Sequence, residues 1–156
     1  MTALYRPNVA GIMMRQDGRI LICERTNTTN AWQFPQGGID EGENALTAIT
    51  REIEEEVGFA PDMYTILQSR GGYRYDYPAE TLEYVRQKRQ IPYIGQEQEY
   101  FLCELKENCP NPRIDFREFG QYKWINPGDF QLEWLPEFKR EVYRQVFEDF
   151  FNLELV

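Results

Sequence analysis

Residues 37–59 read GGIDEGENALTAITREIEEEVGF, and this stretch decides the fold. Its first part is a glycine-rich loop, and its second part has the apolar spacing of a helix. One stripe of that helix, at about 100° per residue, is predicted to be buried: Leu46, Ile49, Ile53 and Val57. Glu43 is expected in the first turn, where a negative charge suits the helix dipole, and Gly58 is a stop signal.

Acidic residues crowd the face beside this stripe. Glu52 meets Glu55 and Glu56 at i+3 and i+4, where each like-charged pair costs roughly 0.2–0.5 kcal/mol. These acids also lie near the negative end of the helix dipole, and no lysine follows any of them by four residues. A solvated helix face is the ordinary interpretation of a charge run. Several conflicts at one place indicate function instead, and a hard divalent cation such as Mg²⁺ would resolve them by binding the carboxylate oxygens.

At every position that the motif specifies, this stretch resembles the Nudix box. The matching residues are Gly37, Glu43, Arg51, Glu52, Ile53, Glu55, Glu56, Gly58 and Phe59. The resemblance implies a hydrolase of nucleoside diphosphates linked to another group, dependent on a divalent metal, Mg²⁺ or Mn²⁺. By position it implies that Glu52, Glu55, Glu56 and the Gly37 carbonyl hold the metal. It also implies that Glu43 and Arg51 brace the loop against the helix.

Composition limits the other function classes. The chain has 156 residues, 42% of them hydrophobic, which predicts a single domain over residues 1–156 with a full-sized core. It has neither an apolar run long enough for a membrane span nor a start like a signal peptide, so we expect a cytoplasmic protein. The net charge of −9 argues against an extended nucleic-acid surface, and the absence of histidine excludes histidine bases and histidine-bound zinc. The cysteines, Cys23, Cys103 and Cys109, are expected to be reduced thiols.

Apolar runs and turn signals predict strands and helices along the rest of the chain. Strands are expected at 8–14, 19–23, 32–34, 64–67, 72–77, 93–95, 100–105 and 121–125, with a bulge at Gly71-Gly72. A second main helix is expected at 136–151, and 79–90 is either a loop or a short helix. Interleaved strands and helices imply an α/β fold with a mixed sheet between helices, which matches the α/β/α sandwich of the Nudix fold.

Segments outside the box resemble one branch of the family, the bacterial RNA pyrophosphohydrolases and the dinucleoside tetraphosphate hydrolases. These segments are 5–9, 32–39, 95–98, 118–119, Trp124 and 138–143. Gln36 supports the assignment, because much of the wider family lacks a glutamine there. By position, Glu118 corresponds to a fourth carboxylate that this branch brings to the metals from a loop; the alternative is an exposed loop acid.

The same resemblance implies a substrate groove. Tyr75 matches a tyrosine that stacks on a base, although a core aromatic is equally consistent with its strand position. Phe138 and Lys139 match residues that contact a base near the RNA 5′ end, unless Phe138 is simply buried. The candidate phosphate contacts are Arg6, Arg25 and Lys139, and the remaining substrate candidates are Gln36, Gln96 and Gln98. Glu99 and Tyr100 depart from the lysine and tryptophan common in the branch, which argues against contact with long RNA.

We therefore expect the partner to be a nucleoside polyphosphate or the 5′-terminal nucleotides of RNA. The first hypothesis is removal of pyrophosphate, or of single phosphates in steps, from triphosphate RNA ends; the alternative is hydrolysis of diadenosine tetraphosphate. In both, a metal-activated water attacks phosphorus, and Glu52 is a ligand or also the base. A non-catalytic Nudix-like regulator would have an eroded box, and a Ca²⁺ binder would have EF-hand spacing, so both are less well supported.

Overall fold

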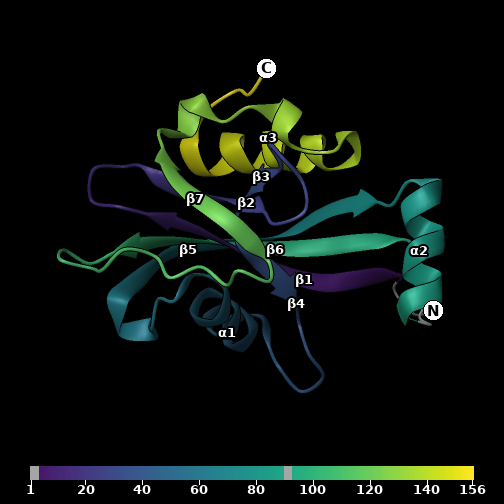
Figure 1. Ribbon diagram of the computed structural model, residues 1–156, viewed down its shortest axis with the longest axis horizontal. Helices are drawn as coiled ribbons and strands as arrows, with labels where there is room; N and C mark the ends of the chain where they lie inside the picture. The colour runs from purple at the N-terminus through teal and green to yellow at the C-terminus, as the bar shows by residue number, and fades with distance from the viewer. Residues whose placement is uncertain (1–3, 90–92) are drawn as a thin grey trace.

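The computed structural model describes residues 4–89 and 93–156, which form a mixed β-sheet between helices (Figure 1). The strands within these residues are β1 (Tyr5–Met14), β2 (Ile20–Arg25), β3 (Trp32–Gln33), β4 (Gln36–Gly38), β5 (Tyr64–Asp76), β6 (Gly95–Leu105) and β7 (Phe119–Ile125). The α-helices are α1 (Ala45–Val57), α2 (Ala79–Arg89) and α3 (Glu137–Phe151). Figure 1 shows α1 and α3 on opposite faces of the sheet, which confirms the expected α/β/α arrangement.

The sheet order is β3-β2-β1-β6-β5, with β4 paired to β1 and β7 paired to β2. β1 and β6 are parallel, and the other pairs are antiparallel. One end of β1 meets β2, where Met14 lies opposite Ile20. Its other part meets β4, where Val9 lies opposite Gly37. The glycine-rich loop is therefore attached to the strand at the centre of the sheet.

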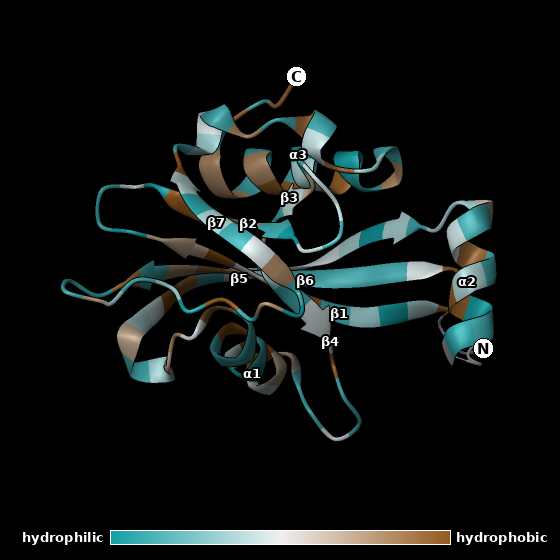
Figure 2. Ribbon diagram, viewed as in Figure 1, coloured by the Kyte–Doolittle hydropathy of each residue, from teal (hydrophilic) through white to brown (hydrophobic). Residues whose placement is uncertain are grey.

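The central strands β1, β2 and β6 are buried on both faces, because successive residues point to opposite sides and α1 and α3 each cover one side. In β1, Ala10 and Ile12 belong to the core beneath α3, whereas Val9 and Met13 belong to the core beneath α1. The same alternation holds in β2 and β6. Figure 2 shows apolar residues along α3 beside the sheet and a mixture of polar and apolar residues on α2, which lies at one end of β1, β5 and β6.

The buried stripe of α1 differs from the predicted one. Leu46 is 54% exposed, and the inner face contains Ala48 and, at one edge, Glu56. Ala48 is small, so the helix packs closely on the sheet, where a Cβ at Gly11 would lie 3.3 Å from Ile53. The stripe is thus rotated toward the acidic residues, which places one of them at the edge of the core.

Several element boundaries also differ from expectation. Glu43 lies outside α1, because the Asn44 side chain accepts a hydrogen bond from the Thr47 N–H and caps the helix at that point. β5 is continuous, with a register shift around the predicted glycine bulge. β6 begins at Gly95 rather than Tyr93, and residues 79–89 form a helix; position 90 lies outside the described residues. No helix in the described ranges is both long enough and apolar enough to span a membrane.

Candidate active site

The junction of β4 and α1 brings the backbone of the glycine loop against Glu52. A Cβ added to Gly37 would overlap the Glu52 carboxylate. Only glycine therefore leaves room for this carboxylate to lie directly over the loop. The neighbouring Gly38 is covered in the same way by the Arg6 guanidinium, which a Cβ there would meet. The loop thus has a carboxylate on one glycine and a cation on the next.

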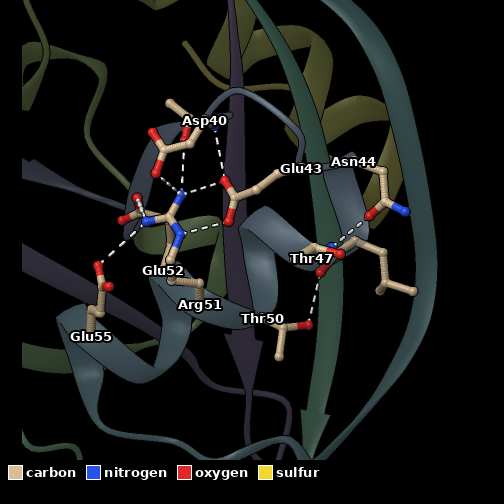
Figure 3. Close-up of polar contacts among 10 residues, drawn as sticks. Asp40, Glu43, Asn44, Thr47, Thr50, Arg51, Glu52 and Glu55 are labelled. Atoms are coloured by element: carbon tan, nitrogen blue, oxygen red, sulfur yellow. Dashed lines mark hydrogen bonds and ion pairs between the residues drawn. The ribbon is translucent and has the colours of Figure 1, made fainter.

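Arg51 fastens this loop to the helix (Figure 3). Its Nε and Nη2 atoms each donate to one oxygen of the Glu43 carboxylate at 2.8 Å, and Nη2 also donates to the Gly38 carbonyl at 3.1 Å. Glu43 accepts a further hydrogen bond from the Asp40 N–H at 2.9 Å. These bonds hold the pKa of Glu43 down at about 2. The Arg51–Glu43 pair therefore links the glycine-rich loop to the helix through a two-pronged contact that the planar guanidinium of arginine supplies.

Arg51 also reaches two of the three acids on the helix face. Its Nη1 atom lies 2.7 Å from Glu52 and 3.4 Å from Glu55 (Figure 3). The prediction that the acids repel without a neighbouring cation was therefore incomplete, because it considered only lysines that follow them. Glu56 has no such cation among the described residues, so no neighbouring positive charge offsets the cost of ionising it.

Glu56 is only 7% exposed, and its Oε1 accepts a hydrogen bond from the Gln36 N–H at 2.8 Å. Burial, followed by the charge of Glu52, raises its pKa to about 9, and Glu118 and Asp115 contribute in the same direction. Burial also raises the pKa of Glu52. A nearby cation would be needed for these carboxylates to be ionised together near neutral pH.

Glu118 reaches the site because its loop is bonded to the end of α1. The Asp115 N–H donates to the Glu56 carbonyl, and the Arg113 N–H donates to the Val57 carbonyl, each at 2.9 Å. The Glu118 N–H in turn donates to the Asp115 carbonyl at 2.9 Å. Asp115 was not predicted as a site residue, although it lies only three residues before Glu118 in the same loop.

This donor set fits a divalent cation in its chemistry. Glu52 lies over the backbone of Gly37, Glu56 accepts a hydrogen bond from the Gln36 N–H, and the loop before β7 brings Glu118 close enough to raise the pKa of Glu56. The most buried of these carboxylates, Glu56, has no cationic partner among the described residues. Within the same residues, no three acidic or cysteine side chains already converge on one point as a finished cage. Arg51 contacts one oxygen of Glu52 and one of Glu55, which leaves the second oxygen of each carboxylate for an ion.

A cavity of about 640 Å³ extends from Glu118 between α2 and the start of α3. Six of the predicted substrate residues line it: Arg6, Arg25, Tyr75, Gln96, Phe138 and Lys139. With Lys88, which was not predicted, the cavity has four basic side chains and a single acid, Glu118, in a chain whose net charge is −9. Such local reversal of charge attracts polyanions.

The base-contacting candidates form one wall of this cavity. The Tyr75 and Phe138 rings lie 5.5 Å apart, and the Lys139 Nζ lies 5.8 Å from the Tyr75 ring centroid. The Tyr75 hydroxyl donates to Gln96 Oε1 at 2.6 Å, so both residues are held in place. Tyr75 is 6% exposed and belongs to the core as well as to the cavity wall, so its interpretation as a core aromatic is confirmed, and its stacking on a base stays a prediction. Burial and the neighbouring Arg25 lower the pKa of Lys139 to about 8.

Two predicted substrate residues lie elsewhere. Gln98 is 4% exposed, and its side-chain amide is bonded to Asn8, Gln36 and Tyr100. A direct contact between Gln98 and substrate is therefore wrong, because the side chain is beneath the loop and its amide is already paired. Gln36 is joined to Gln98 and, through its backbone, to Glu56, which places it under the carboxylates rather than in the cavity.

Comparison with known proteins shows the family of the chain. The NUDIX domain family matches residues 4–146. The chain is 39% identical to a protein named RNA pyrophosphohydrolase from Francisella tularensis subsp. mediasiatica, covering 91% of this chain and 90% of that one. It is 38% identical to the Shewanella denitrificans protein of the same name, covering 94% and 84%.

Solved structures share the fold. A Caenorhabditis elegans Ap4A hydrolase complex superposes with a TM-score of 0.65 at 17% identity, covering 95% of this chain and 99% of that one. The Escherichia coli dihydroneopterin triphosphate pyrophosphohydrolase superposes with a TM-score of 0.66 at 22% identity, covering 94% and 96%. Since the family match extends over nearly the whole described chain and the acidic motif lies at the loop and helix where the fold brings carboxylates together, the chain belongs to the Nudix family of hydrolases.

Proposed function

We propose that this protein hydrolyses the anhydride between the α and β phosphates at the triphosphate 5′ end of RNA. Water supplies the oxygen, the anhydride bond breaks, and the products are a 5′-monophosphate end and pyrophosphate. The observation that carries the proposal is the basic cavity, which begins at Glu118 beside the carboxylates and continues past aromatic rings. A triphosphate end has the same sequence of parts, a polyanion followed by a base.

The relatives support the choice of substrate, because the named ones at 36–39% identity over most of the chain are RNA pyrophosphohydrolases. The net negative charge of the protein is consistent with a contact limited to the first nucleotides of the RNA. With a net charge of −9, the protein is unsuited to binding RNA along its length, whereas four basic side chains line the cavity that the 5′ end would enter.

The residues of the site have separable tasks in this reaction. Nudix hydrolases generally depend on a divalent metal ion, and we propose Mg²⁺ or Mn²⁺, held by Glu52, Glu55, Glu56, Glu118 and the Gly37 carbonyl. When bound, such an ion lowers the pKa of water and neutralises charge on the phosphates. Glu52 lies over Gly37, and burial raises its pKa; we propose that it also accepts the proton of the attacking water. Arg6 and Arg25 hold the phosphates, and Arg51 with Glu43 keeps the loop in register with the helix.

The test is to incubate the protein and Mg²⁺ with a short 5′-triphosphate RNA and to identify the products by mass spectrometry. We expect a 5′-monophosphate RNA and pyrophosphate, and we expect Glu56→Gln and Glu55→Gln to remove turnover while circular dichroism shows an unchanged fold. Full turnover in both variants at saturating Mg²⁺ would contradict the assignment of the carboxylates.

Hydrolysis of dinucleoside tetraphosphate is the second candidate. The cavity favours it in one respect, because its aromatic residues offer flat surfaces that accept any base. The two substrates are compared by kcat/KM under the same conditions. A higher value for diadenosine tetraphosphate than for the triphosphate RNA would make it the preferred substrate.

A further inference from the structure

Glu118 differs from the other proposed metal ligands, because it belongs to no helix or strand. It lies one residue before β7, whereas the other acids are on α1 and Gly37 is on β4. Its side chain is exposed, so packing does not hold the carboxylate in place. The position of this carboxylate therefore depends on how the backbone of residues 115–118, here called the bridge, is held.

The bridge is fixed at both of its ends. At the first end, the Asp115 N–H donates to the Glu56 carbonyl of α1. At the second end, Thr26 in the loop after β2 forms two bonds. Its N–H donates to the Glu118 carbonyl at 3.0 Å, and its Oγ1 donates to the Phe116 carbonyl at 3.1 Å. A single threonine thus holds two carbonyls of the bridge.

These two bonds lie where the ladder between β2 and β7 ends. Arg25 is paired with Phe119, and the register shifts between Glu24 and Arg25. Shifts of this kind disrupt the regular ladder locally. Thr26 and Glu118 are the next residues beyond the two strands, so the hydroxyl of Thr26 supplies a contact that the ladder no longer provides.

The loop that presents Thr26 is closed by bonds of its own. The Asn30 N–H donates to the Glu24 carboxylate at 2.8 Å, and Asn30 has a left-handed backbone with φ of 60°, which asparagine tolerates better than most residues. The Arg25 N–H donates to the Ala31 carbonyl at 3.0 Å. Thr26 therefore bonds to the bridge from an ordered support.

Asp115 shapes the turn between the two fixed ends. Its carboxylate accepts hydrogen bonds from the N–H and the guanidinium of Arg117 at 3.1 Å. Its carbonyl accepts the N–H groups of Glu118 and Phe119 at 2.9 Å each. Aspartate often forms a turn in this way, by bonding to the backbone two residues on. With its shape fixed by Asp115, the bridge transmits the position of Thr26 to Glu118.

We propose that Thr26 is a positioning residue for Glu118, because its hydroxyl holds the bridge so that the Glu118 carboxylate stays beside the acids of α1. This inference deepens the proposed function and rests on its assignment of Glu118 as a metal ligand. Thr26 is not one of the residues that line the cavity, so its effect on the site passes through Glu118.

The experiment measures Mn²⁺ binding to the substrate-free protein by electron paramagnetic resonance. Thr26→Val keeps the branched shape and the N–H but lacks the hydroxyl, and we expect it to weaken Mn²⁺ binding about twofold to tenfold, the size of one hydrogen bond. Thr26→Ser restores the donor and should restore the affinity. The matched control is Thr28→Val, which removes an exposed hydroxyl from the same loop and should leave the affinity unchanged.

A double variant separates positioning from a general effect on the fold. In the Glu118→Gln background, Thr26→Val should weaken Mn²⁺ binding no further, because the carboxylate that it positions is absent. Hydrogen exchange of the metal-free protein provides a readout without any ion. We expect the amides of residues 115–118 to exchange faster in Thr26→Val than in wild type, and Thr28→Val to exchange as wild type does.

The outcomes separate this inference from the proposed function. If Thr26→Val binds Mn²⁺ as tightly as wild type, or weakens binding equally in the Glu118→Gln background, the positioning role alone is overturned. If Glu118→Gln leaves Mn²⁺ affinity unchanged, Glu118 is not a ligand, and the positioning role is overturned with that assignment. If the Mn²⁺ affinities change as expected but triphosphate RNA is not cleaved, the positioning role is supported and the proposed hydrolysis is overturned.

Discussion

The Gln98 side-chain Nε2 donates a hydrogen bond to Gln36 Oε1 over 2.9 Å, and this bond connects the buried sheet to the catalytic loop. Gln98 is itself held by the Tyr100 hydroxyl, which donates to its Oε1 at 3.0 Å, and it also donates to Asn8 Oδ1 at 2.9 Å. The Gln36 N–H then donates to Glu56. Hydrogen bonds thus connect the Gln98 side chain on β6 to the Gln36 side chain, and the Gln36 backbone to the Glu56 carboxylate. Buried hydrogen-bond networks hold their members in one arrangement.

Because Gln98 acts through Gln36, their substitutions should not be additive. Gln98→Leu removes the amide while keeping most of the volume, and we expect it to lower kcat on the order of tenfold, since small displacements at a reacting centre have large effects. In a Gln36→Ala background, Gln98→Leu should lower kcat little further. If the double variant lost kcat by the product of the two single losses, Gln98 would not act through Gln36.

The tyrosines of the same core provide the control. Tyr100→Phe removes the hydroxyl that orients Gln98, whereas Tyr73→Phe removes a hydroxyl that donates to Asp149 outside the site. The two rings lie 5.4 Å apart in one core. We expect only Tyr100→Phe to lower kcat, with thermal unfolding recorded to separate this effect from a change in stability.

Glu56 should destabilise the metal-free fold at alkaline pH. Its folded pKa of about 9 is above the ordinary carboxyl value of 4.5, so the folded state binds the proton more tightly and stability falls as pH rises between these values. Glu56→Gln cannot ionise and keeps an acceptor for the Gln36 N–H. In a chelating buffer at pH 8 we expect the variant to unfold at least roughly 2–4 °C higher than wild type, equivalent to about 1 kcal/mol.

The pH and metal dependence of this difference provide the check. At pH 4.5 the difference should vanish, and added Mg²⁺ should stabilise the wild type more than the variant. A variant that is less stable than wild type at pH 8 without metal would contradict the raised pKa of Glu56 in the folded state.

Lys139 should set an alkaline limit on substrate capture. Its lowered pKa, about 8, means that it is charged below this pH and becomes neutral above it, so attraction for phosphate is lost as pH rises. Since kcat/KM reports the ionisation of the free enzyme, we expect it to decline above about pH 8 and expect Lys139→Arg to remove this decline. Lys106→Arg, at an exposed lysine outside the cavity, is the control, and an unchanged profile for Lys139→Arg would contradict the assignment.

The space above Gly37 can be tested with one methyl group. Gly37→Ala would place a Cβ on the Glu52 carboxylate, whereas Gly128→Ala meets no atom within 4 Å. We expect Gly37→Ala to displace Glu52 and reduce kcat/KM on the order of 10²-fold, and Gly128→Ala to have no effect. Equal activity of the two variants would show that Glu52 need not lie over the loop.

Sequence reasoning succeeded where the signal is local. The cap at Gly58, with φ of 79°, and the apolar alternation of the strands follow from residues adjacent in the chain. It was wrong for Leu46, because an amphipathic period gives the direction of a helix face only approximately. It was wrong for Gln98, because the sequence of a strand does not show which polar residue will be enclosed by its neighbours.

The sequence by itself determined the family, the loop and helix that carry the acids, and the α/β/α layering, because periodicity, caps and motif spacing depend on short stretches of chain. Tertiary structure alone decided that Asp115 bonds to the Glu56 backbone and so delivers Glu118, that Gln98 lies beneath Gln36, and that α2 faces the cavity. These relationships join segments distant in the chain, and they arise from strand register and the docking of loops on helices, which no local pattern specifies.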